Sequence, residues 1–232
     1  MWLVDSSVGR KVIMSISGLF LIVFLLIHLS VNCLMYVSPA AFGLGCEFMG
    51  TPFVSVMVPL LALGFVIHIV YAFVLNARNL KARGHEKYAG GSKTDVNWAA
   101  KNMLALGVIV LGGLAFHMSH FWAEMQLPMF LGQEEYASVP ANEILNADGE
   151  LVAPYYLAKM TFSNVIFSLI YIVWICALWF HLSHGFWSAF QTLGVNNRVW
   201  YTRWKNIGLI LATVLCLGFI SIPVSFLIGI LN

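Results

Sequence analysis

The sequence contains few charged residues. Asp, Glu, Lys and Arg make up 9% of its 232 residues, whereas 60% are hydrophobic and the mean hydropathy is +0.86. A soluble globular domain has about 25% charged residues, so this composition excludes an ordinary soluble domain. The formal net charge is only +2, and we predict no nucleic-acid partner.

Cysteines are also scarce and show no pairing motif. There are four, at Cys33, Cys46, Cys176 and Cys216, with no CxxC and no CxxCH haem-attachment motif. Any haem must therefore be held without a thioether bond. Cys33 and Cys46 are both expected near the outer membrane face, either as a disulfide or as packing residues.

Long apolar runs account for most of the sequence. Five segments each exceed the roughly 20 residues that cross a bilayer as a helix, at approximately 12–37, 53–77, 102–123, 155–190 and 206–231. The first is too long for the apolar core of a signal peptide and lacks a small-residue cleavage site, so we expect it to be retained. The sequence predicts an all-α integral membrane protein with five transmembrane helices, forming a single membrane domain over 1–232.

The charged residues divide between the two sides of this predicted bundle. If the spans alternate in direction, one side holds Arg10, Lys11, Arg78, Lys81, Arg83, Lys87, Lys93, Lys101, Arg198, Arg203 and Lys205. The other side holds Lys159 with the acids Glu47, Glu124, Glu134, Glu135, Glu143, Asp148 and Glu150. The positive-inside rule then predicts a cytoplasmic N-terminus and an outside C-terminus.

The central part of each predicted span has no Asp, Glu, Lys or Arg. Ion-coupled transporters and voltage sensors depend on such charges, so their absence argues against both classes. Histidines stand in the first four spans instead: His28, His68, His117 and His181. The third and fourth spans each carry a second histidine one turn further on, His120 and His184. An imidazole without a partner is costly in hydrocarbon, so each of these side chains is expected to bind something.

The four histidines fall at two predicted depths. His28 and His117 lie 17 and 16 residues after the basic residues that mark the inner ends of their spans, hence roughly 25 Å from the inner boundary. His68 and His181 each lie 10 residues before the inner ends of theirs, hence roughly 15 Å from that boundary. The sequence therefore predicts two pairs, each drawn from two different helices.

Two such pairs suit two b-type haems, because a haem iron takes an axial imidazole on each face and the macrocycle is apolar. Gly64 and Gly113 lie four residues before two of the histidines and would give the ring room, although tight helix packing uses the same small residues. His120 would lie about 4.5 Å nearer the outer surface than His117, out of register with its partner. His184 stays open as an alternate ligand or a propionate contact.

Residues near the outer helix ends are candidates for a quinone pocket. Glu124 follows His117 by seven residues and so points in a similar direction. The other candidates are Asn32, His120, Trp122 and Glu47. An ordinary interfacial role is the alternative for each of them.

The spans carry longer motifs as well. They are SISGLFLIVFLLIHLSVN, EFMGTPF, GVIVLGGLAFH and FHLSHGFWSAFQTLG, with a Gly-x9-His spacing at Gly18 to His28 and Gly107 to His117. These motifs resemble the dihaem cytochrome b membrane anchor of succinate:quinone oxidoreductases and fumarate reductases, the complex II family, over nearly the whole chain. The resemblance implies that His28 and His117 ligate a distal haem and that His68 and His181 ligate a proximal haem near the cytoplasmic face. It favours His181 over His184.

The resemblance also implies partners in a bacterial inner (cytoplasmic) membrane. A flavoprotein subunit with FAD and an iron-sulfur subunit would dock on the basic cytoplasmic face and interconvert succinate and fumarate. Electrons would pass through the two haems between the iron-sulfur subunit and a membrane quinone, expected to be menaquinone. Quinone chemistry would belong to this chain and dicarboxylate chemistry to a partner; a dimer of complexes is a further expectation.

Candidate haem-propionate contacts implied in this way are Ser15, Ser17, Arg10, Lys11, Arg78 and His184. One position departs from the family pattern. Some members carry a glutamate two residues before the fourth ligand, and here that residue is Trp179. A compensating proton pathway through this position is therefore not expected.

Two rival functions remain at the level of sequence. The chain could be the cytochrome b subunit of a hydrogenase or formate dehydrogenase, which its partner proteins would distinguish. It could instead be a non-haem membrane scaffold or transporter whose histidines only form hydrogen bonds, which the absence of b-type absorbance would reveal.

Overall fold

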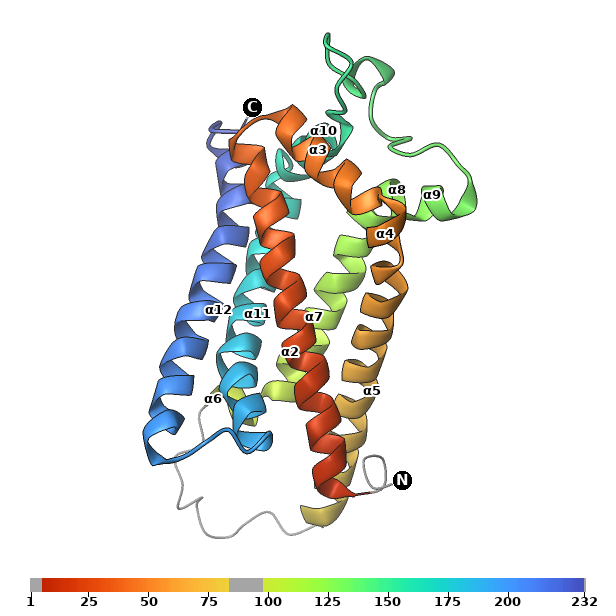
Figure 1. Cartoon of the computed structure of the whole chain (residues 1–232). Coiled ribbons are helices and arrows are strands. Elements are labelled where there is room, and N and C mark those ends of the chain that lie inside the picture. The colour runs from red at the N-terminus through yellow and green to blue at the C-terminus, as the bar shows by residue number, and fades with distance from the viewer. Residues whose placement is uncertain (1–5, 84–97, 232) are drawn as a thin grey trace. The chain divides into compact units, whose positions relative to one another are not determined.

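The computed structural model describes residues 6–83 and 98–231, apart from the side chains of Phe53, Ser55 and Arg83. This described part is helical, with one isolated bridge between Leu145 and Leu151 in a connecting segment (Figure 1). Lys87 and Lys93 of the predicted basic loop lie outside it.

Five helical segments are long and apolar enough to cross a membrane. They are α2 (Ser7–Asn32) with η1 (Cys33–Tyr36), α5 (Met57–Arg83), α7 (Met103–His117) with η2 (Met118–Trp122) and α8 (Ala123–Met125), α11 (Val165–Thr192), and α12 (Arg198–Leu227). These helices confirm the all-α fold class and the five predicted spans. The chain is a multi-pass membrane protein.

The fourth span begins later than the sequence predicts. Residues 155–162 belong instead to a separate helix, α10 (Ala153–Phe162), and α11 starts at Val165. The Asn164 side chain accepts hydrogen bonds from the backbone N–H groups of Ile166 (2.9 Å) and Phe167 (3.3 Å). Asparagine in this position caps the new helix, which explains why the apolar run is interrupted there.

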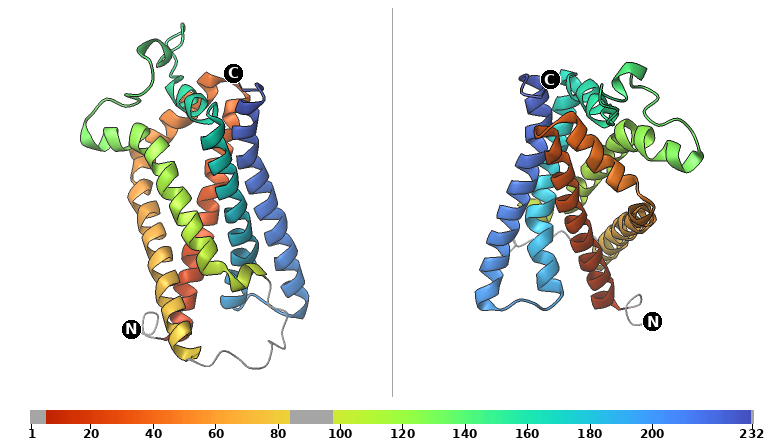
Figure 2. Two further views of the ribbon diagram at one scale, coloured as in Figure 1. Left: turned by 180° about the vertical axis from the view of Figure 1, so that it is seen from behind. Right: turned by 45° about the horizontal axis from the view of Figure 1, so that its top comes forward.

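The remaining helices connect the long ones, and all of them except α3 have five residues or fewer. They are α3 (Pro39–Gly50), α4 (Pro52–Ser55), α6 (Trp98–Lys101), α9 (Leu127–Leu131) and η3 (Ala141–Glu143). Ser38 caps α3 by accepting a hydrogen bond from the N–H of Ala41 at 3.0 Å. α3 packs against α10 (Figures 1 and 2). Gly43 lies so close to the carbonyl of Leu151 that a side chain there would overlap it.

The chain packs as two compact units, each built from pieces of all five long helices. One comprises Met1–Phe24, Pro59–Val108 and Leu178–Val214, and the other comprises Leu25–Val58, Ile109–Ala177 and Leu215–Asn232. His68 and His181 belong to the first unit, and His28 and His117 belong to the second. The single domain over 1–232 stays a prediction.

Candidate functional site

In the first unit the rings of His68 on α5 and His181 on α11 lie against each other. Their centroids are 6.2 Å apart and their planes meet at 73°. The hydroxyl of Ser17 lies 3.3 Å from His68 Nδ1 and also donates a hydrogen bond to the carbonyl of Met14 at 3.0 Å. Ser17 therefore holds His68 through one ring nitrogen.

In the second unit His28 on α2 and His117 on α7 form the other pair. Their ring centroids are 5.8 Å apart and their planes meet at 82°. The ring of Phe219 lies over His28, with the ring centroids 5.6 Å apart, and the indole of Trp174 lies over His117, with the centroids 5.8 Å apart. Aromatic side chains thus limit the access of water to this pair.

The separation of the rings suits a metal between them. A metal–imidazole bond is about 2 Å, so two imidazoles on opposite sides of one metal have centroids about 6 Å apart. Among the residues that the structure describes, no group of three or more His, Cys, Asp or Glu is placed to hold a metal ion. Two imidazoles alone would leave an iron incompletely ligated, and a porphyrin would supply the ligands that the protein does not.

One nitrogen in each pair lacks a hydrogen bond. Nδ1 of His117 and Nδ1 of His181 are buried and have no hydrogen-bond partner within the described part of the chain. A buried polar atom without a partner costs about 1–3 kcal/mol. Nδ1 of His184 is in the same condition, so these atoms alone do not identify a ligand. The two imidazoles of each pair, with ring centroids about 6 Å apart, are a donor set that fits haem iron.

Two glycines let neighbouring helices approach the His68–His181 pair. A Cβ on Gly18 would lie 3.2 Å from His68 Cε1, and a Cβ on Gly107 would lie 3.7 Å from His181 Cε1. These are the glycines of the Gly-x9-His spacing. Each stands ten residues before one histidine in sequence but contacts a histidine of the other pair.

Gly64 and Gly113 have another role than the sequence suggested. A Cβ on Gly64 would lie 2.7 Å from the ring of Phe20, and one on Gly113 would overlap the indole of Trp174. The Trp174 Nε1–H also donates a hydrogen bond to the carbonyl of Val110 at 3.0 Å. Both glycines therefore serve helix packing, the alternative that the sequence left open.

His184 lies apart from the His68–His181 ring contact. Its ring lies 4.9 Å from that of Trp187, and its Nδ1 is buried without a hydrogen-bond partner among the described residues. The Lys205 ammonium lies over the rings of Trp187 (5.0 Å) and Tyr201 (4.4 Å). A cation beside an imidazole is a setting for an anionic group, so Lys205 is a propionate candidate that the sequence reasoning missed.

The other propionate candidates divide by exposure. Arg10, Ser15 and Ser17 are buried along α2, whereas Lys11 and Arg78 are exposed. Trp179 donates a hydrogen bond to the Thr213 hydroxyl at 3.0 Å, which ties α11 to α12. Figures 1 and 2 show these two helices side by side.

The predicted quinone residues do not all converge. The Asn32 side chain donates to the carbonyl of His28 at 2.7 Å, and the Glu124 carboxylate accepts from the N–H of Ser138 at 3.2 Å. His120 and Trp122 belong to η2, a π-helical turn directly after His117. Glu47 is exposed on α3 and lies near Tyr136, whose pKa is raised by burial and then by Cys46, Glu135 and Glu47.

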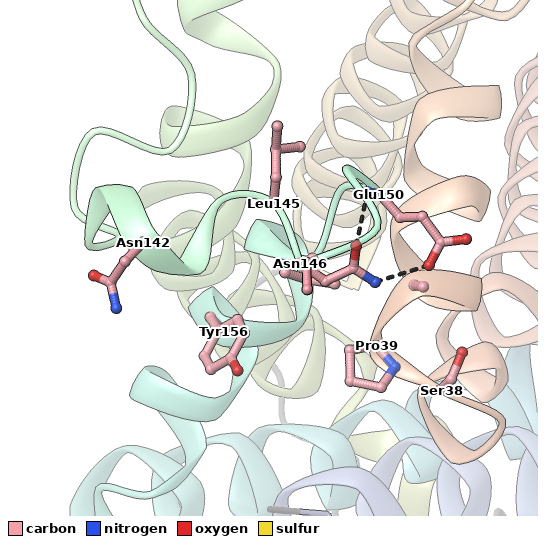
Figure 3. A pocket seen from close by; sticks show the side chains of 10 residues that line it. Ser38, Pro39, Asn142, Leu145, Asn146, Glu150 and Tyr156 are labelled. Atoms are coloured by element: carbon pink, nitrogen blue, oxygen red, sulfur yellow. Dashed lines mark hydrogen bonds between the residues drawn. The ribbon is translucent and has the colours of Figure 1, made fainter.

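A shallow groove of about 470 Å³ adjoins Glu47, and a second of about 420 Å³ lies beside it. Both include Ser38, Ala40 and Glu150. In Figure 3 the carboxylate of Glu150 accepts a hydrogen bond from the Asn146 amide at 2.8 Å, so the loop is held by its own side chains. None of the paired histidines lines either groove.

Fold and geometry together define the class: an all-helical, multi-pass membrane protein with two pairs of imidazoles in ring contact. Comparisons with models of known protein families, with curated proteins and with solved structures found no match to this chain.

Proposed function

We propose that this chain is the membrane-anchor cytochrome b subunit of a complex of the succinate dehydrogenase and fumarate reductase type, carrying two b haems. One observation carries the proposal: imidazoles from four different spans meet in two pairs. The ring centroids within the pairs are 5.8 Å and 6.2 Å apart, the spacing expected of two imidazoles that bind one iron. The family assignment rests on the sequence motifs. A bound haem supplies one-electron redox chemistry.

Each residue near the pairs has a role in this proposal. His28 and His117 hold the distal haem, and His68 and His181 hold the proximal haem. Ser17 orients His68 through Nδ1, as an outer partner of a ligating histidine does. Trp174 and Phe219 shield the distal ligands from water, which favours the reduced, less charged state of a bound metal.

The partners are those that the family resemblance implies, and the charge distribution supports the face on which they would dock. Exposed basic side chains at the expected inner ends of the helices include Lys11, Arg78, Lys81, Arg198 and Arg203. They would face an iron-sulfur subunit and a flavoprotein subunit with FAD in the cytoplasm. Menaquinone would exchange electrons with the distal haem from the membrane.

Absorbance and co-purification test the proposal. The full chain, purified in mild detergent from its native membrane, is expected to show b-type bands after reduction with dithionite and two haems per chain by pyridine haemochrome assay. An iron-sulfur protein and a flavoprotein should co-purify. A hydrogenase or formate dehydrogenase subunit in their place would favour that rival, and a colourless protein would refute any cytochrome function.

The orientation of the chain in the membrane can be tested separately. Relative to the unaltered protein, whose native cysteines give the background signal, Asp148→Cys should gain labelling by a membrane-impermeant maleimide in spheroplasts, because this loop is expected outside. The maleimide should label Arg203→Cys only after the membrane is permeabilised. Labelling of Arg203→Cys alone in intact spheroplasts would reverse the topology. Native Cys46 should react slowly, because burial raises the pKa of its thiol to about 12.

A further inference from the structure

The hydroxyl of Tyr171 has no hydrogen-bond partner among the residues that the structure describes, although the residue is only 3% exposed. Tyr171 lies on α11 and is enclosed by the rings of Phe116, His117, His120, Phe121, Phe162 and Trp174. A phenylalanine would fill the same space without burying a polar atom. A tyrosine in this position therefore points to a bound group that accepts its O–H.

A second polar group stands beside it. The π-helical turn η2 (Met118–Trp122) carries His120, whose ring centroid lies 6.3 Å from that of Tyr171. His120 Nδ1 lies 2.9 Å from the carbonyl oxygen of Phe116. A carbonyl only accepts, so Nδ1 carries a proton, and in the neutral ring Nε2 is then the hydrogen-bond acceptor. π-turns of this kind are frequent at functional sites.

We propose that Tyr171 and His120 are the hydrogen-bonding pair of a binding site for a quinone head group. The Tyr171 hydroxyl donates to a carbonyl oxygen of the quinone, and His120 Nε2 accepts from a hydroxyl of the quinol. This inference rests on the proposed function, because it assigns the quinone site left open there. Tyr171 and His120 thereby take the place of Asn32 and Glu124 as the expected polar contacts of the quinone, because the side chains of Asn32 and Glu124 form hydrogen bonds within the protein.

The surroundings suit this ligand. The side chains in contact with Tyr171 are aromatic, and aromatic rings also pack well against the flat ring of a quinone. Tyr171 lies 6.1 Å from the His117 ring, centroid to centroid, so a molecule bonded to its hydroxyl lies next to a ligand of the distal haem. A haem carboxylate could also accept a hydrogen bond from the Tyr171 hydroxyl. The experiment must therefore distinguish a quinone carbonyl from a haem carboxylate as the acceptor.

The test compares Tyr171→Phe and His120→Leu with the unaltered protein as purified, full-length complexes. Menaquinone-4 is the probe, and its Kd and its infrared C=O stretching band are measured in each. We expect Tyr171→Phe to raise the Kd about tenfold, the effect of one lost hydrogen bond, and to shift the C=O band to higher frequency. His120→Leu should weaken binding of the reduced menaquinol-4 more than binding of menaquinone-4.

Tyr36→Phe is the matched control, because it also removes one tyrosine hydroxyl from the second unit. Unlike that of Tyr171, the Tyr36 hydroxyl has partners within the protein: it lies 2.8 Å from the Ser221 hydroxyl and 3.0 Å from the Ser225 hydroxyl. It should leave the Kd and the C=O band unchanged. An unchanged band and Kd in Tyr171→Phe would overturn the inference, as would an altered distal haem spectrum with normal menaquinone-4 binding, which would assign the hydroxyl to a haem carboxylate. An unaltered protein without b haem would refute the proposed function itself.

Discussion

Replacing His181 with alanine is expected to remove one haem and leave the other largely intact. In the proposed function His181 would supply one of the two histidine ligands of a single haem, because its ring contact is with His68. His68→Ala should give the same result. Pyridine haemochrome assay of the purified protein should fall from two haems per chain to about one, and the remaining reduced band should be the same in both variants.

His184→Ala provides the control on the same helix. His184 lies three residues from His181 but contacts Trp187 instead of the paired ring, so both haems should be retained. Equal loss of both haems in His181→Ala would contradict two independent sites. Loss of one haem in His184→Ala, with none lost in His181→Ala, would reassign the ligand.

Replacing Gly113 with alanine is expected to destabilise the second unit by about 1–3 kcal/mol, the usual cost of overpacking. The new methyl group would overlap the indole of Trp174, which is fixed on α7 by its hydrogen bond to Val110. Trp174 also covers His117, so its displacement should loosen that ligand. Thermal unfolding in detergent measures the first effect, and the distal haem content measures the second.

Gly112 is a closely matched control for this prediction. A Cβ on Gly112 would meet nothing within 4 Å, whereas the neighbouring Gly113 faces a helix. Gly112→Ala should therefore be neutral, or stabilise by up to about 1 kcal/mol through helix propensity. Equal thermal stability of the two variants would contradict the prediction that Gly113 is needed for the close approach of α7 and α11 at Trp174.

The sequence by itself determined the elements and their residue content. Low charge and five apolar runs were enough for five spanning helices, because a helix satisfies all its backbone hydrogen bonds within one continuous apolar segment. Position along a helix is also set by sequence, since each residue adds a fixed rise. The histidines could thus be grouped by depth, and the structure places the rings of each group in contact. Haem ligation by these residues stays a prediction.

Only the tertiary structure decided what faces what. Gly18 contacts His68 and Gly113 contacts Trp174, neither of which the sequence indicated. The Tyr171 hydroxyl lies among aromatic rings without a hydrogen-bond partner in the described part of the chain. Tyr171 gave one weak signal, a hydroxyl in an otherwise apolar run. In a soluble helix a polar face reveals the rotation about its axis. In these spans both lipid and interior are apolar, so that rotation is fixed by small residues and side-chain packing between helices distant in sequence.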